Sequence, residues 1–185
     1  MMNNFRVMMV LGALLLAGAP AVSCAESGGQ EEKLCCKMFN SSSWNEKEIT
    51  WNNKLFVKDR VRSVLHVPLN FRQVIDRTMK RLQLSGAKNT DDLILSDENS
   101  LWGADVYIAV DREIPGAAMT KLSGRFMTKV FNGPYSNMKG YIEEMRVFVG
   151  SKNKEIKKMY FFYTTCPRCA KVYGTNYIVI FAQIN

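Results

Sequence analysis

Two pairs of cysteines carry the most reactive side chains of this sequence. Cys35 and Cys36 are adjacent, and Cys166 and Cys169 frame a Cys-Pro-Arg-Cys motif 130 residues later. In an oxidising compartment, an even number of cysteines is interpreted first as disulfides, which here would tie an N-terminal arm to a late hairpin. A zinc site with four thiolate ligands is the second interpretation, although adjacent cysteines are an awkward pair of ligands.

Two further kinds of chemistry are less favoured by the sequence. A thioredoxin-like redox role requires its first cysteine at a helix N-terminus. Cys166 instead follows the strand-like segment 159–165 and precedes another expected strand. His66 has no metal-binding or catalytic side chain at helical spacing, so we interpret it as structural.

The first residues indicate export. A short positive region ends at Arg6, residues 7–19 form an apolar run too short for a comfortable membrane span, and small residues follow. Residues 21–24 (Ala-Val-Ser-Cys) resemble a lipobox, in which Cys24 would be lipidated, although Ala21 stands where leucine is usual. We therefore expect either a secreted periplasmic protein or a lipoprotein anchored to the membrane through Cys24.

Charge and length favour one soluble domain without a nucleic-acid partner. The net charge is +8, but the basic residues are interleaved with acidic ones, and no nucleic-acid-binding motif is present. The 185 residues suit a single core once the ends are removed. We expect a signal peptide at 1–24, a tether at 25–43 and a domain at 44–185.

The hydrophobic periodicity predicts the same order of elements twice. Residues 44–51 look like a polar arm with two tryptophans. Gly, Pro and Asn residues separate the strand-like and helix-like segments that follow. In the first half we expect an extended segment at 55–66, a helix at 71–84, strands at 93–95 and 104–110, and a turn at 97–103. In the second half we expect an extended segment at 118–131, a helix at 135–149, and strands at 159–163 and 177–184 around a loop at 166–174.

This pattern predicts an α+β fold. Two β-α-β-β units would form an antiparallel sheet with two helices on one face and a central cleft. A duplicated half-barrel commonly forms a pocket where its halves meet.

The order of elements, the motif Phe131-Asn-Gly-Pro-Tyr135 before the second helix and the strand 105–108 together resemble the GyrI-like small-molecule-binding domain, a relative of SOUL proteins. The resemblance spans about 56–184. It implies a groove with aromatic walls and a carboxylate, which binds aromatic or cationic organic molecules. Some members of that family hydrolyse strained, electrophilic compounds. No DNA-binding segment precedes the domain, so a role as a transcription factor does not follow.

The resemblance assigns candidate site residues. The candidate aromatic walls are Trp102, Tyr107, Tyr135, Tyr163 and Phe181. The family's acid on the last strand has no counterpart, because 177–185 contains no Asp or Glu, and the possible substitutes are Asp105, Glu143 and Glu144. We therefore expect a protein that binds an apolar or aromatic molecule without a cofactor. The alternative is a hydrolase in which a pocket carboxylate activates water.

Overall fold

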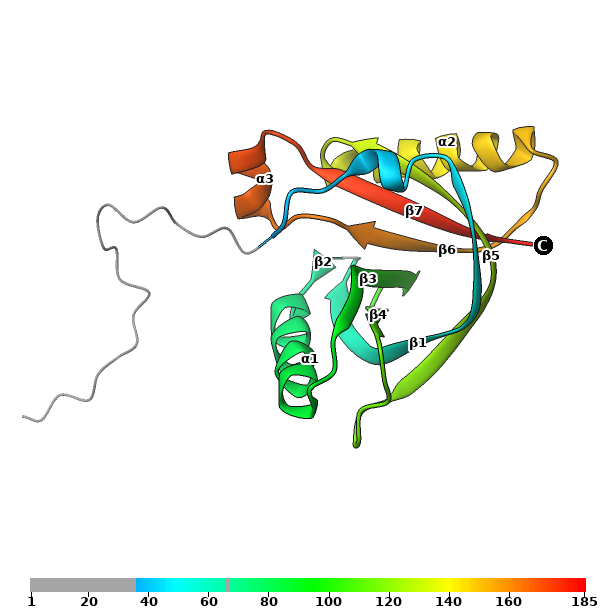
Figure 1. Ribbon diagram of the computed structural model, residues 1–185. Helices are drawn as coiled ribbons and strands as arrows, with labels where there is room; N and C mark the ends of the chain where they lie inside the picture. Colours follow the sequence, from blue (N-terminus) through cyan, green and yellow to red (C-terminus); the bar gives the residue numbers. More distant parts are fainter. Residues whose placement is uncertain (1–35, 66) are drawn as a thin grey trace, which may run out of the picture. The chain divides into compact units, whose positions relative to one another are not determined.

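The computed structural model describes residues 36–65 and 67–185, so Cys24, Cys35, His66 and the expected export signal lie outside the described residues. Figure 1 shows how the elements are arranged. The strands are β1 (Lys47–Val64), β2 (Val67–Pro68), β3 (Asn89–Ser100), β4 (Gly103–Val110), β5 (Met119–Asn132), β6 (Ile156–Tyr163) and β7 (Tyr177–Ile184). The α-helices are α1 (Phe71–Ser85), α2 (Met138–Ser151) and α3 (Pro167–Tyr173), and short 3-10 helices are η1 (Ser41–Ser43) and η2 (Tyr135–Asn137).

Six antiparallel strands close into a barrel in the order β1-β4-β3-β6-β7-β5, and β5 pairs again with β1. Closure depends on the length of β1, whose 18 residues pair with β5 along the first part and with β4 along the second. The register shifts between Trp51 and Lys54, where Asn53 has a φ of 54° and donates its N–H to Ser123 Oγ over 2.8 Å. Irregularities of this kind bend a strand around a barrel.

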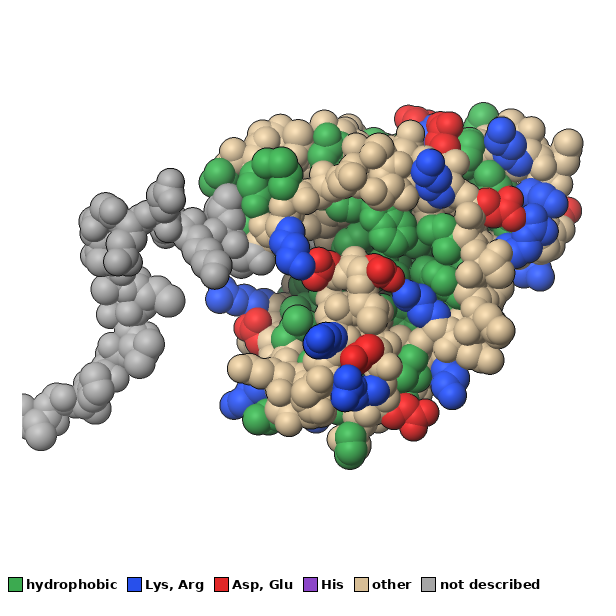
Figure 2. Space-filling view, in the orientation of Figure 1, with side chains coloured by type: hydrophobic (Ala, Val, Ile, Leu, Met, Phe, Trp, Pro, Cys, Tyr) green, Lys and Arg blue, Asp and Glu red, His purple; other side chains and the backbone are tan. Residues whose placement is uncertain are grey.

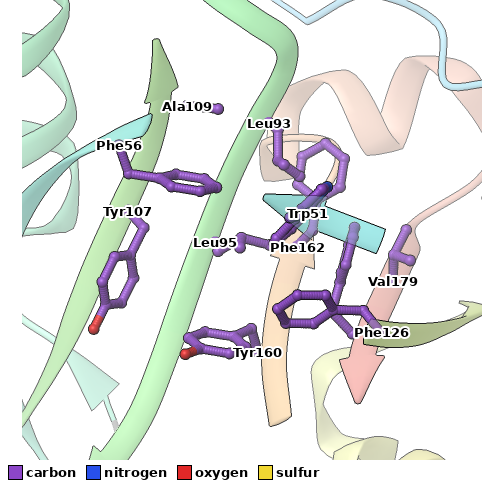
Figure 3. Packing of buried hydrophobic residues seen from close by; sticks show 11 residues of the cluster. Trp51, Phe56, Leu93, Leu95, Tyr107, Ala109, Phe126, Tyr160, Phe162 and Val179 are labelled. Atoms are coloured by element: carbon purple, nitrogen blue, oxygen red, sulfur yellow. The ribbon is translucent and has the colours of Figure 1, made fainter. Parts of the chain in front are cut away.

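The interior of the barrel is largely aromatic. Alternate residues of the strands point inward, and Figure 3 shows how they pack. Trp51 lies at the centre, with ring centroids 4.4 Å from Phe126 and 5.7 Å from Phe181. The buried interior residues are Trp51, Phe56, Leu93, Leu95, Tyr107, Ala109, Phe126, Tyr160, Phe162, Val179 and Phe181. Trp51, expected in an arm, is therefore part of a strand and of the core.

The helices cover different strands. Val74 and Leu82 of α1 pack with outward-facing residues of β1 and β4, whereas Met145 and Val149 of α2 pack with residues of β5, β6 and β7. The predicted α+β class and antiparallel sheet are confirmed, but the sheet is closed rather than open with both helices on one face. The duplication of one unit stays a prediction.

Two segments differ from the sequence prediction in ways that affect function. Residues 97–100 were expected in a turn, but they continue β3 and pair with β4 through Asp97–Asp105 and Ser100–Gly103. Pairing with β4 holds residues 97–100 in a strand, although their composition favours a turn. The expected loop 166–174 contains α3, which has Pro167 in its first turn and is followed by the C-cap residue Gly174 with a φ of 68°.

This helix changes the setting of Cys166, because the residue caps the N-terminus of α3 and is not followed directly by a strand. The expectation that Cys166 stands apart from a helix N-terminus was therefore wrong. In the part of the chain that the structure describes, no helix is long and apolar enough to cross a membrane.

Residues 36–43, expected within a tether, contact the barrel. The ring of Phe39 lies 6.0 Å from Phe162 and 5.6 Å from Tyr177.

Figure 2 shows one face of the molecule, on which acidic and basic side chains are interspersed around a hollow that exposes hydrophobic side chains.

Candidate functional site

The candidate site is a pocket beside the place where β3 and β6 separate. Among the described residues, Ser96 and Phe161 form the one register pair between these two strands. β3 carries Glu98 two residues after Ser96, and β6 carries Tyr163 two residues after Phe161. Because the strands are antiparallel, these two residues lie on opposite sides of the register pair, and their side chains meet through a hydrogen bond. Both side chains line a pocket of about 850 Å³.

Glu98 is held by two tyrosines. The hydroxyl of Tyr163 donates to Oε1 over 2.5 Å, and the hydroxyl of Tyr135 donates to Oε2 over 3.1 Å. The two rings lie 6.0 Å apart at an angle of 48°. A carboxylate has about four acceptor positions. The tyrosines use two of them, so the others can accept hydrogen bonds from a water molecule or a ligand.

Both phenols stay protonated at neutral pH. Burial, followed by the negative charge of Glu98, raises the pKa of Tyr135 to about 12. The same two causes raise the pKa of the more deeply buried Tyr163. At neutral pH both tyrosines therefore keep the O–H groups that donate to Glu98.

The loop before α2 places Tyr135 in the pocket. Gly133 has a φ of 145°, which L side chains rarely adopt, and a β-carbon there would overlap the hydroxyl of Tyr141. Gly133 N–H donates to Asn176 O over 3.0 Å, and Asn176 Nδ2 donates to Gly133 O over 2.9 Å. Pro134 follows, and the turn of η2 then starts at Tyr135. The Gly-Pro-Tyr motif thus fixes the path of the chain into the site.

The remaining walls come from both halves of the chain. Val61, Pro68 and Phe71 contribute apolar surface from β1, β2 and α1. On the other side, α3 contributes Ala170 and Lys171. Exposed lining atoms are mostly apolar, so the pocket suits an organic molecule with few polar groups.

The structure brings two of the five candidate wall residues together. Tyr135 and Tyr163 line the pocket. Tyr107 and Phe181 are buried in the barrel core, and Trp102 lies in the β3–β4 connection with 64% of its surface exposed. These three residues are not part of the pocket lining.

The candidate acids lie elsewhere. Asp105 is buried and forms an ion pair with Lys58 over 2.9 Å. Glu143 lies on α2 and pairs with Arg146 over 3.4 Å, and Glu144 is exposed on the same helix. The carboxylate in the pocket is Glu98, which sequence reasoning missed because 97–103 was expected to be a turn. The sequence held one signal for it: in a strand every second residue points to the same face, so a strand continued past Ser96 places Glu98 on the face of Ile94 and Ser96.

The cysteines form a separate cluster. The sulfur atoms of Cys36, Cys166 and Cys169 lie within 4.8 Å of one another. Cys169 is fully buried, and the other two are half-buried. Cys35, expected as the fourth member, lies outside the described residues.

Residues 27–184 match a family model described as bacterial hydrolase. The chain belongs to this bacterial hydrolase family. The match includes every strand of the barrel, together with Glu98 and both tyrosines that contact it. No curated protein matches the chain.

Solved structures share the fold of this family member. A hydrolase from Listeria innocua superposes with a TM-score of 0.53 and 10% sequence identity, over 76% of this chain and 92% of that one. A structure described as an uncharacterized conserved protein from Listeria innocua gives a TM-score of 0.54, with the same identity and coverage. At this identity the likeness concerns the fold alone.

Proposed function

We propose that the protein hydrolyses an electrophilic small organic molecule in this pocket, with Glu98 as the general base. The main support is that Tyr135 and Tyr163 hold the carboxylate of Glu98 in the pocket through two hydrogen bonds. Membership of a family described as bacterial hydrolase supports the same class of reaction. The pocket volume of about 850 Å³ is ample for a drug-sized organic molecule.

The reaction consumes one water molecule. Glu98 takes a proton from the water as the oxygen attacks the electrophilic carbon, and the bond from that carbon to the leaving atom breaks. The leaving atom is an oxygen in an epoxide or ester and a carbon in a cyclopropane. A tyrosine O–H gives its proton to this atom, and the proton on Glu98 then returns to the tyrosine oxygen. Tyr135, which is 47% exposed, is our choice for this proton donor. Tyr163 is more buried and acts as a positioning residue for Glu98.

The lining also indicates a substrate class. The tyrosine rings and the apolar side chains of β1, β2 and α1 favour a compound with an aromatic or alicyclic body. Epoxides, esters and cyclopropanes present an electrophilic carbon on such a body. The mostly apolar exposed surface of the pocket argues against sugars or nucleotides as substrates.

Turnover of an epoxide, ester and cyclopropane panel by wild type and Glu98→Gln tests the proposal. Loss of a positioned general base typically costs about 10²–10⁴-fold in rate, so we expect a fall of at least about 100-fold. Glu143→Gln is the matched control, because that carboxylate lies on α2 and does not line the pocket. Equal rates for wild type and Glu98→Gln would refute the role of Glu98.

Binding without turnover is the second candidate, and the aromatic wall formed by Tyr135 and Tyr163 favours it. A planar fluorescent dye should then bind to wild type and lose affinity in Tyr135→Ala. Dye binding combined with no turnover of any substrate would favour this role over hydrolysis. In both cases the partner is a small molecule, and the expected export signal would place the pocket in the periplasm or at the membrane surface.

A further inference from the structure

The cysteine cluster joins two distant parts of the chain. Cys36 lies in residues 36–43, the arm that precedes the barrel. Cys166 caps α3, and Cys169 lies in the first turn of that helix. Their three sulfur atoms lie within 4.8 Å of one another. One disulfide joins two sulfurs, about 2.05 Å apart, whereas one metal ion can bind all three.

We propose that Cys36, Cys166 and Cys169 bind a zinc ion. In a tetrahedral site with zinc–sulfur bonds of about 2.3 Å, the sulfur atoms are about 3.8 Å apart. The upper limit of 4.8 Å found here is about 1 Å longer, a difference that side-chain rotation can supply. Three thiolates would leave one position of the tetrahedron for a further donor.

Backbone groups support the same ligand set. The N–H of Cys166 donates to Cys36 Sγ over 3.3 Å, and the N–H of Cys169 donates to Cys166 Sγ over 3.5 Å. Donors directed at sulfur stabilise the thiolate form, which is the form that binds a metal. The two-residue spacing of Cys166 and Cys169 is also that of structural zinc sites.

The ion would have a structural effect on the pocket. Tyr173 of α3 already donates its hydroxyl to Cys36 O over 2.6 Å, which links the helix to the arm. Zinc would add a second and stronger link at the start of α3. Because Ala170 and Lys171 of this helix line the pocket, the metal would hold one pocket wall in place.

Metal content tests this proposal. Protein expressed from the full-length sequence, and purified without chelator or added metal, should contain about one zinc per chain by elemental mass spectrometry. Cys36→Ser and Cys166→Ser should retain less than about one fifth of that content. Val172→Ser is the control on the same helix, since Val172 is 64% exposed and offers no sulfur, and it should keep the full amount.

Two further measurements keep the test decisive even if a cysteine variant folds poorly. Cobalt(II) added to wild-type protein stripped of metal should produce the intense visible bands of tetrahedral cobalt–thiolate coordination. These bands should be absent in Cys36→Ser. A peptide map that shows Cys36 joined by a disulfide to Cys166 or Cys169, or a wild type that binds neither metal, would overturn the proposal. None of these readouts depends on turnover, so they are independent of the proposed hydrolysis.

Discussion

Replacing Gly133 with alanine tests how the loop before α2 positions Tyr135. The backbone at Gly133 has a φ of 145°, and a β-carbon would overlap the Tyr141 hydroxyl. A non-glycine residue in such a conformation costs about 1–3 kcal/mol, and forcing an extra carbon into a packed site costs about 1–3 kcal/mol more. We therefore expect Gly133→Ala to lower the free energy of unfolding by about 2–6 kcal/mol.

The two costs can be separated by a second substitution. Tyr141→Phe removes the overlapping oxygen, so in the Gly133→Ala background it should restore about 1–3 kcal/mol. The cost of the backbone conformation should remain. Alone, Tyr141→Phe loses its 3.5 Å hydrogen bond to Asn132 O, worth about 1 kcal/mol or less. A double-mutant cycle therefore isolates the steric contribution.

Urea unfolding followed by circular dichroism measures these free energies. Gly140→Ala is the matched control, since Gly140 lies inside α2 with nothing within 4 Å of an added β-carbon. That change should leave stability equal or raise it by up to about 1 kcal/mol. If Gly133→Ala were as stable as wild type, or if Tyr141→Phe restored nothing, the account of this loop would be refuted.

Three further outcomes follow from the structure. Met145→Ala, at a fully buried position of α2, should lower the free energy of unfolding by about 2–5 kcal/mol in urea, whereas exposed Val147→Ala should change it by less than about 0.5 kcal/mol. The pKa of Tyr135 is raised from 10.0 to about 12, so its stabilising contribution is complete below pH 10 and is lost as the pH rises towards about 12. Tyr135→Phe should therefore lose less stability than wild type between about pH 10 and pH 12, as urea unfolding at a series of pH values can measure, and an equal loss in both proteins would contradict this. Tyr163→Phe removes a hydrogen bond to a charged group, worth about 1.5–3 kcal/mol, and should lower kcat/KM by about 10- to 100-fold, whereas an unchanged kcat/KM would argue against positioning by Tyr163.

Local patterns were sufficient to predict most elements. The apolar stripe containing Val74 and Leu82 predicted α1, and the aromatic and β-branched run at 177–184 predicted β7 with the observed bounds. Closure of the barrel was not predictable in this way. It depends on β1 pairing with two strands far along the chain, and such pairing leaves no periodic signal.

The candidate site was predicted only in part for a related reason. The motif at 131–135 identified Tyr135, and the aromatic strand 159–163 contained Tyr163. Glu98 was missed because Asp97, Asn99 and Ser100 favour a turn when read alone, while in the fold their strand pairs with β4. The sequence predicted that the two cysteine pairs meet, and among the described residues three of these cysteines lie together. The helix α3 was not predicted, although Pro167 and Gly174 mark its ends.

The ratio of kcat/KM for Glu98→Gln to that of wild type decides whether Glu98 is the general base, measured on whichever substrate of the panel wild type hydrolyses. Glutamine keeps the size of the side chain but cannot accept a proton from water. If Glu98 is the general base, we expect a ratio of about 0.01 or lower, with the ratio for Glu143→Gln close to 1. A ratio near 1 for Glu98→Gln would show that the carboxylate held by Tyr135 and Tyr163 is not the general base.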